Sequence, residues 1–167
     1  MGFIDFLSKL FGNKSQRDLK EITPWVERVK ELYPEIDALS NDELRGRTAA
    51  LRQRIQDYVA SERAEVESLK ASIDGKDLDQ REAIWAQVDK LEKEILDKIE
   101  VILDEIHPEA FAIVKSTGRR FAEQAEIRVQ ATDFDRQLSL THDFVRIEGD
   151  TAIYQNHWIA GGNEIFW

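Results

Sequence analysis

The sequence predicts a mainly α-helical protein with a small β part, an α+β fold class. A composition of 42% hydrophobic and 34% charged residues over 167 positions favours long solvated helices. Two long stretches carry apolar residues at alternating spacings of three and four, which is typical of paired helices. Beyond Gln124 apolar and polar residues alternate instead, which indicates short strands near the C-terminal end.

These patterns divide the chain into four segments. We expect N-terminal amphipathic and linker helices in residues 1–39, a long helical hairpin in 40–106, a further helix in 107–124 and a short β-hairpin region in 125–167. The last segment ends on the apolar run Ile165-Phe166-Trp167, so we expect it to be the start of an incomplete domain.

The opening residues predict a short amphipathic helix that ends at Gly12-Asn13. A second helix is expected from Ser15 as its cap, kinked or split at Pro24 because proline lacks the N–H that a helix interior needs. Its apolar positions form one face: Leu19, Ile22, Val26, Val29 and Leu32.

The hairpin is predicted from a start signal, two apolar seams and a turn. Ser40 and Glu43 have the spacing of a capping box, and Asp74-Gly75-Lys76-Asp77 supplies the turn. Two such seams should pair as antiparallel helices. The first seam comprises Leu44, Thr48, Leu51, Ile55, Tyr58, Glu62, Val66, Leu69 and Ile73. The second comprises Ile84, Val88, Leu91, Ile95, Ile99, Ile102 and Ile106.

After the hairpin, Pro108 is expected to open a further helix, since proline is favoured in the first helical turn. Phe111, Val114 and Phe121 should share one face of it. Strands are expected at 126–130, 144–147 and 152–159, with Gly161-Gly162 closing a hairpin.

No constellation in the sequence predicts catalysis, cofactor binding or metal binding. The chain has no P-loop, because Gly75-Lys76 is followed by Asp77, and it has no cysteine. Asp133-Phe134-Asp135 lacks calcium-loop spacing and is expected to be an exposed acidic loop. A net charge of -10 argues against nucleic acid as a partner.

The opening helix is the candidate contact surface. Among the first twenty residues four are basic and two are acidic, opposite in sign to the rest of the chain. Its apolar face could lie on an anionic bilayer or pack against a partner helix, and the sequence leaves both open. The candidate membrane or partner contacts are Phe3, Ile4, Leu7, Lys9, Leu10, Phe11, Lys14 and Arg17.

Three stretches together resemble the N-terminus of the SecA family, the ATPases that drive preproteins through the SecY channel. They are residues 11–17, residues 33–48 with their Leu39-Ser40-Asn41-Asp42-Glu43-Leu44 run, and residues 107–115, His-Pro-Glu-Ala-Phe-Ala-Ile-Val-Lys. Residues 57–105 and 122–160 look like insertions similar to those of the Bacteroidetes branch.

The resemblance implies a parent protein that binds ATP and magnesium and exports preproteins through the SecY channel complex. It further implies a cytoplasmic protein peripherally bound to the inner membrane, with anionic lipid, preprotein and a second SecA copy as partners. The sequence contains no Walker A motif, so no nucleotide-binding residue is carried over and the chain alone is not expected to be an enzyme. It would contribute membrane or partner contact and scaffolding. The alternative is a free-standing coiled-coil adaptor.

Overall fold

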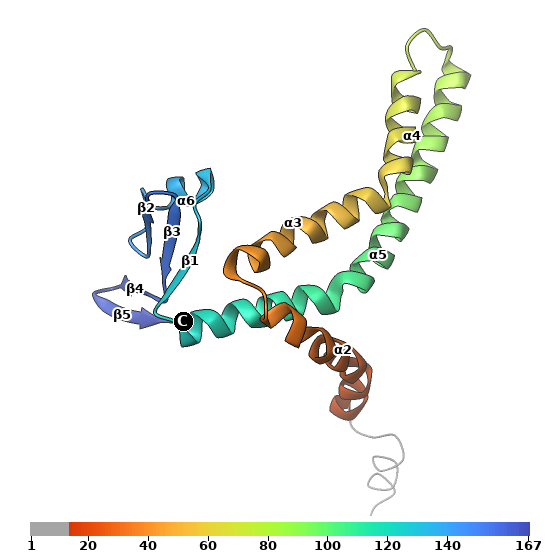
Figure 1. Ribbon diagram of the computed structural model, residues 1–167. Coiled ribbons are helices and arrows are strands. Elements are labelled where there is room, and N and C mark those ends of the chain that lie inside the picture. Colours follow the sequence, from red (N-terminus) through yellow and green to blue (C-terminus); the bar gives the residue numbers. More distant parts are fainter. Residues whose placement is uncertain (1–13) are drawn as a thin grey trace, which may run out of the picture. The chain divides into compact units, whose positions relative to one another are not determined.

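The computed structural model describes residues 14–167, which fall into two units. We call residues 45–110 the arm, and residues 14–44 with 111–167 the sheet unit. The expected fold class, mainly α with a small β part, is confirmed (Figure 1). The helices are α2 (Lys14–Asp37), α3 (Asn41–Tyr58), α4 (Ala60–Ala71), α5 (Leu78–Glu123) and α6 (Asp133–Leu138). The strands are β1 (Glu126–Gln130), β2 (Val145–Glu148), β3 (Thr151–Gln155), β4 (His157–Ala160) and β5 (Asn163–Phe166).

The predicted antiparallel hairpin forms the arm. α4 lies beside the first part of α5 (Figure 1). The connecting turn contains Gly75 with a φ of 80°, a conformation that glycine adopts without strain. The seam predicted along α5 is buried or half-buried at every position. At the centre of the arm, the buried cluster consists of Val59, Val66, Val88 and Ile95.

The first seam differs from its prediction at Thr48, which is exposed, and at Tyr58, where the helix is interrupted. A continuous helix through residue 73 was expected, but α3 ends at Tyr58 and α4 begins at Ala60. Val59 between them has φ -117° and ψ 13° and is fully buried, whereas Tyr58 is 39% exposed. Val59 and not Tyr58 therefore occupies the seam at the break between the two helices.

Ion pairs line the edges of the arm. Lys98 Nζ lies 2.6 Å from Glu62 Oε1, so the polar position predicted within the first seam is paired with a cation. The hydrogen bond from Lys98 lowers the pKa of the Glu62 carboxyl. Arg54 reaches both Glu105 and Glu109, at 2.6 and 3.0 Å.

The three prolines interrupt the helices less than the sequence predicts. α2 runs unbroken through Pro24 and Pro34, and it begins before Ser15, so the split and the Ser15 cap are both wrong. The backbone around Pro24 is exposed, where water can bond the carbonyl that loses its helical donor. α5 likewise continues through Pro108, and no helix starts there. Pro108 is fully buried, so packing on the continuous apolar stripe offsets the lost hydrogen bond.

The sheet unit contains a three-stranded antiparallel sheet in the order β1-β3-β2, with Val129 and Ile147 both opposite Ala152. Strands were expected at 126–130 and 144–147, and β1 and β2 confirm both to within one residue. Phe121 of α5 packs against the sheet's buried cluster. Phe111 and Val114 are instead exposed, and the buried face of this part of α5 carries Ala112, Ile113, Ser116 and Arg120.

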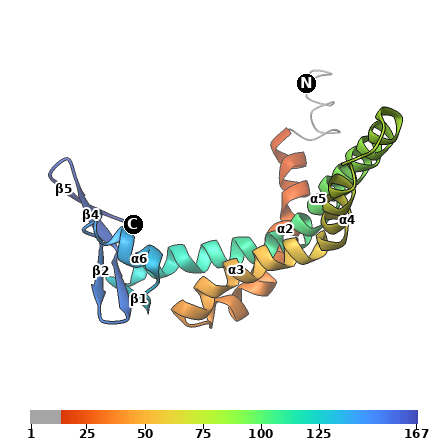
Figure 2. The same ribbon diagram turned by 90° about the horizontal axis from the view of Figure 1, so that it is seen from above.

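The strand expected over 152–159 is two strands. β3 ends at Gln155, and β4 begins at His157 and pairs with β5 as a separate two-stranded hairpin beside the sheet (Figures 1 and 2). Asn156 lies at the transition. Its N–H bonds the carbonyl of Ala125 and its carbonyl bonds the N–H of Trp167, so its backbone joins both hairpins. Gly161 and Gly162 are both at positive φ and form a turn, but this turn joins β4 to β5, a strand that the sequence did not predict.

Residues 133–135 are not an exposed loop but the first turn of α6. Thr132 and Asp135 form a capping box, and Asp135 is fully buried. Its carboxylate accepts hydrogen bonds from the Thr132 N–H, the Thr132 hydroxyl and the Tyr154 hydroxyl. The Thr-x-x-Asp spacing is a capping signal, with Asp in the position that Glu or Gln usually occupies.

Candidate functional site: an arginine junction and an exposed helix face

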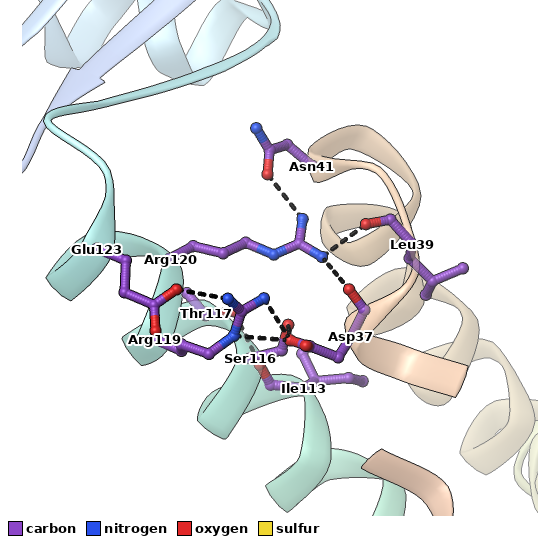
Figure 3. Close-up of polar contacts among 9 residues, drawn as sticks. All are labelled: Asp37, Leu39, Asn41, Ile113, Ser116, Thr117, Arg119, Arg120 and Glu123. Atoms are coloured by element: carbon purple, nitrogen blue, oxygen red, sulfur yellow. Dashed lines mark hydrogen bonds and ion pairs between the residues drawn. The ribbon is translucent and has the colours of Figure 1, made fainter. Parts of the chain in front are cut away.

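Two neighbouring arginines near the end of α5 hold the turn between α2 and α3 (Figure 3). Arg120 is only 6% exposed. Its guanidinium donates to the carbonyls of Leu39 at 2.6 Å and Asp37 at 3.2 Å, and to Asn41 Oδ1 at 2.7 Å. Carbonyls at a helix C-terminus lack helical donors and carry partial negative charge, so a cation is favoured there.

Arg119 binds the side chain of Asp37 at the same turn. Its Nη2 and Nε lie 2.8 and 3.1 Å from Asp37 Oδ1, while Nη1 lies 2.5 Å from Glu123. The Ser116 hydroxyl donates to the same Asp37 oxygen at 2.8 Å (Figure 3). Asp37 would otherwise place a negative charge at the negative end of the α2 dipole, so Arg119 compensates an unfavourable position.

The electrostatic balance of this cluster favours the charged forms. Desolvation alone would raise the pKa of Asp37, but hydrogen bonds from Arg119, Ser116 and Tyr33 outweigh it and hold that pKa below its ordinary value. The hydrogen bond with Asp37 in turn raises the pKa of Arg119. Asp37 and Arg119 are therefore an ion pair at every physiological pH.

The start of α3 extends the junction to the sheet. The predicted capping box is confirmed, since the Ser40 N–H donates to Glu43 at 2.8 Å and the Glu43 N–H to Ser40 Oγ at 3.3 Å. The next two side chains bond the backbone of edge strand β1. Asn41 Nδ2 donates to the Arg128 carbonyl at 3.1 Å, and Asp42 Oδ1 accepts from the Gln130 N–H at 2.8 Å. Unpaired groups of a sheet edge are thereby satisfied.

We call Asp37, Asn41, Asp42, Arg119 and Arg120 the arginine junction. It ties α2, α3, α5 and β1 together within the sheet unit. Within residues 14–167 no group of three or more acidic or histidine side chains could hold a metal ion. The hydrogen bonds and ion pairs of the arginine junction are suited to holding these four elements in place.

The sequence prediction did not find the junction. Its one signal is Arg119-Arg120, a pair of cations on a helix in the strongly acidic part of the chain. For this part of α5 the sequence predicts an apolar buried face of Phe111, Val114 and Phe121, and not buried arginines.

The second candidate feature is the exposed face of α2. Of the predicted contact residues, Phe3, Ile4, Leu7, Lys9, Leu10 and Phe11 lie outside the described residues. Lys14 and Arg17 lie in the first turns of α2 and are exposed. The apolar face that follows them is also exposed, by 63% at Leu19, 53% at Ile22 and 42% at Val26.

In the part of the chain from Lys14 onward, no helix has both the length and the apolar composition needed to cross a bilayer.

Comparison with known proteins connects these features to a family. A profile of the SecA DEAD-like domain matches residues 7–134. The chain belongs to the SecA family. The predicted resemblance to the N-terminal segment of SecA, in the form found in Bacteroidetes, is confirmed. No solved structure matches the chain.

The SecA relatives are similar over the full chain. Protein translocase subunit SecA of Porphyromonas gingivalis (strain ATCC 33277) is 70% identical over 167 residues, and that of Parabacteroides distasonis is 64% identical over 167 residues. SecA of Flavobacterium psychrophilum is 42% identical over 169 residues. Each match covers 100% of this chain but 15% of the relative, so the chain spans about a seventh of the length of these SecA proteins.

Proposed function

We propose that this chain is the membrane- and partner-contacting scaffold segment of a SecA-type protein-export motor. The family supports protein export as the process, since the relatives are named protein translocase subunits. Identity of 70% along the whole chain favours this proposal over a free-standing coiled-coil adaptor. The parent protein would use ATP and magnesium to move preproteins through the SecY channel complex, and no residue of this chain is assigned to that chemistry.

The observation that carries the contact role is the face of α2. Leu19, Ile22 and Val26 are exposed on a helix whose first turns carry Lys14 and Arg17. A helix with an apolar face and basic residues lies in the interface of an anionic bilayer, where each cation contributes about 1 kcal/mol. A peripheral location at the inner membrane is part of this proposal, and the same face of α2 supports it.

The arginine junction supplies the scaffolding role. A force on α2 reaches α5 and the edge of the sheet through Asp37 and the turn that follows it. Arg119 and Arg120 would therefore transmit the position of a docked α2 to the rest of the sheet unit.

Cosedimentation with vesicles tests the contact role. The intact chain should pellet with vesicles of equal parts phosphatidylglycerol and phosphatidylcholine, and not with phosphatidylcholine alone. We expect Lys14→Glu with Arg17→Glu to lower the bound fraction at least about tenfold, because two attractive charges become repulsive. Leu19→Gln with Ile22→Gln should also release the chain, and so should removal of residues 1–14.

Leu140→Gln is the matched control, since Leu140 is 84% exposed but lies outside α2. It should leave vesicle binding unchanged. Equal binding to neutral and anionic vesicles, or equal loss with the control, would contradict the membrane role and favour a protein partner for α2.

A further inference from the structure

The arm carries an apolar line that is not part of its buried seam. Trp85, Leu96 and Leu103 of α5 are 11 and 7 residues apart, which is close to whole helical turns, so they share one face. They are exposed by 47%, 63% and 46%. Single exposed apolar residues are common on proteins, but three in register along one helix indicate a contact surface.

Acidic side chains occupy the positions between these apolar residues. With Asp89, Glu92 and Glu100 included, residues on this face of α5 follow one another three or four positions apart. We call these six residues the outer stripe: Trp85, Asp89, Glu92, Leu96, Glu100 and Leu103. Glu92 pairs with Lys70 at 3.0 Å, whereas Asp89 and Glu100 form no ion pair among residues 14–167. Between residues 82 and 104 the chain has seven acidic and three basic residues, so the surroundings have the same sign.

This charge excludes several occupants of the outer stripe. A second copy that presented its own outer stripe would bring acidic side chains against Asp89 and Glu100, and like charges at a buried contact are costly. An anionic bilayer or a nucleic acid would be repelled for the same reason. A segment that covers the apolar residues must therefore bring its own cations.

We propose that the outer stripe docks a cationic amphipathic helix of a partner protein. Apolar side chains of that helix would cover Leu96 and Leu103, and Lys or Arg side chains beside them would pair with Asp89 and Glu100. The 4-3 spacing of the outer stripe is that of a helix seam, so the arm would gain a third helix on this face. This surface belongs to the arm alone and does not depend on the contact role of α2.

The probe is a synthetic amphipathic peptide of Leu and Lys, fluorescein-labelled, with a peptide of Leu and Glu in the same order as its control. Fluorescence anisotropy with the full chain should show binding of the Leu/Lys peptide only. We expect Leu96→Gln with Leu103→Gln to raise Kd at least about tenfold, because two apolar contacts are lost. Glu100→Lys should weaken binding in the same direction and reduce its dependence on salt.

Each variant has a control on another face of the arm. Val101 is 56% exposed and lies two residues before Leu103, about 200° around the helix, so Val101→Gln should change Kd less than about twofold. Glu65→Lys on α4 makes the same charge change as Glu100→Lys away from the outer stripe. All five substituted positions are exposed, so circular dichroism should show the helix content of the unmodified chain in every variant.

Several results would overturn the proposal: no binding of the Leu/Lys peptide, equal binding of both peptides, or equal weakening by the controls. Self-association in sedimentation equilibrium that Leu96→Gln with Leu103→Gln abolishes would assign the surface to a second copy instead. The vesicle experiment uses variants of α2 only, so failure of either proposal is visible separately.

Discussion

The arm and the sheet unit are stabilised by different kinds of contact. In the arm, branched apolar side chains of α3, α4 and α5 fill one seam, and the charged groups stay at its partly exposed edges. In the sheet unit, Arg120 and Asp135 are themselves buried: Arg120 bonds the carbonyl of Leu39, and Asp135 bonds Thr132 and Tyr154. Stability is therefore spread over many similar contacts in the arm, whereas the sheet unit adds to its own apolar cluster a concentrated contribution from a few buried polar groups.

Arg120→Met should produce the largest change in the free energy of unfolding. It tests whether a few buried polar groups contribute a large share of the stability of the sheet unit. The substitution leaves two carbonyls and the Asn41 amide without their buried donor, so we expect a loss of about 3 kcal/mol in the free energy of unfolding. Urea denaturation measures the loss, and hydrogen exchange should place it at β1 rather than in α4.

Arg136→Met is its control, since Arg136 pairs with the exposed Asp150. That change should cost less than about 0.5 kcal/mol. Similar losses for the two variants would mean that the buried guanidinium holds the sheet unit no more strongly than a surface ion pair does.

Val88→Ala tests the arm, with a smaller expected effect. Val88 is 1% exposed at the centre of the seam, so loss of two methyl groups should reduce stability by about 2 kcal/mol. Faster amide exchange should appear in α4 and the first half of α5 and leave β1 unchanged. Val101→Ala removes the same atoms from an exposed site and should have little effect. If β1 also loses protection, the two units unfold together and the comparison fails.

Acid should weaken the sheet unit through Asp37, the smallest of the three effects because the group is partly exposed. Its pKa is lower in the folded than in the unfolded state, so its contribution is complete above the unfolded value and is lost as pH falls below about 4. Urea midpoints at successive pH values should fall less steeply in that window for Asp37→Asn. Asp57→Asn should keep the slope of the unmodified chain, and identical slopes for both variants would remove Asp37 as a source of acid sensitivity.

Features that depend on neighbouring residues could be predicted. The seam of α5 appears in its periodicity because every third or fourth residue of a helix faces the same side. The Ser40–Glu43 capping box and the Gly161-Gly162 turn are likewise local. Thr132–Asp135 is a capping box of the same kind, and its spacing is a local signal as well, although the two nearby aspartates suggest an exposed acidic loop.

The errors arise where distant parts of the chain decide the outcome. Whether a proline ends a helix depends on the tertiary contacts of the residues before and after it. Pro108 is buried within α5, and the helix continues on both sides of it. Whether Tyr58 or Val59 faces the seam depends on α5. Arg119 and Arg120 look like ordinary surface cations until residues 37–41 lie beside them, about eighty positions earlier in the chain.

The sequence by itself therefore determined the helical class, the hairpin, the short strands and the resemblance to SecA, since periodicity, turn residues and motifs are properties of adjacent positions. Only the tertiary structure decided which helices continue, which residue breaks the first seam, and which charges are buried. The physical reason is that desolvation and hydrogen bonding of Arg120 and Asp37 depend on groups that folding brings together. Such contacts between distant residues leave no regular spacing in the sequence from which they could be predicted.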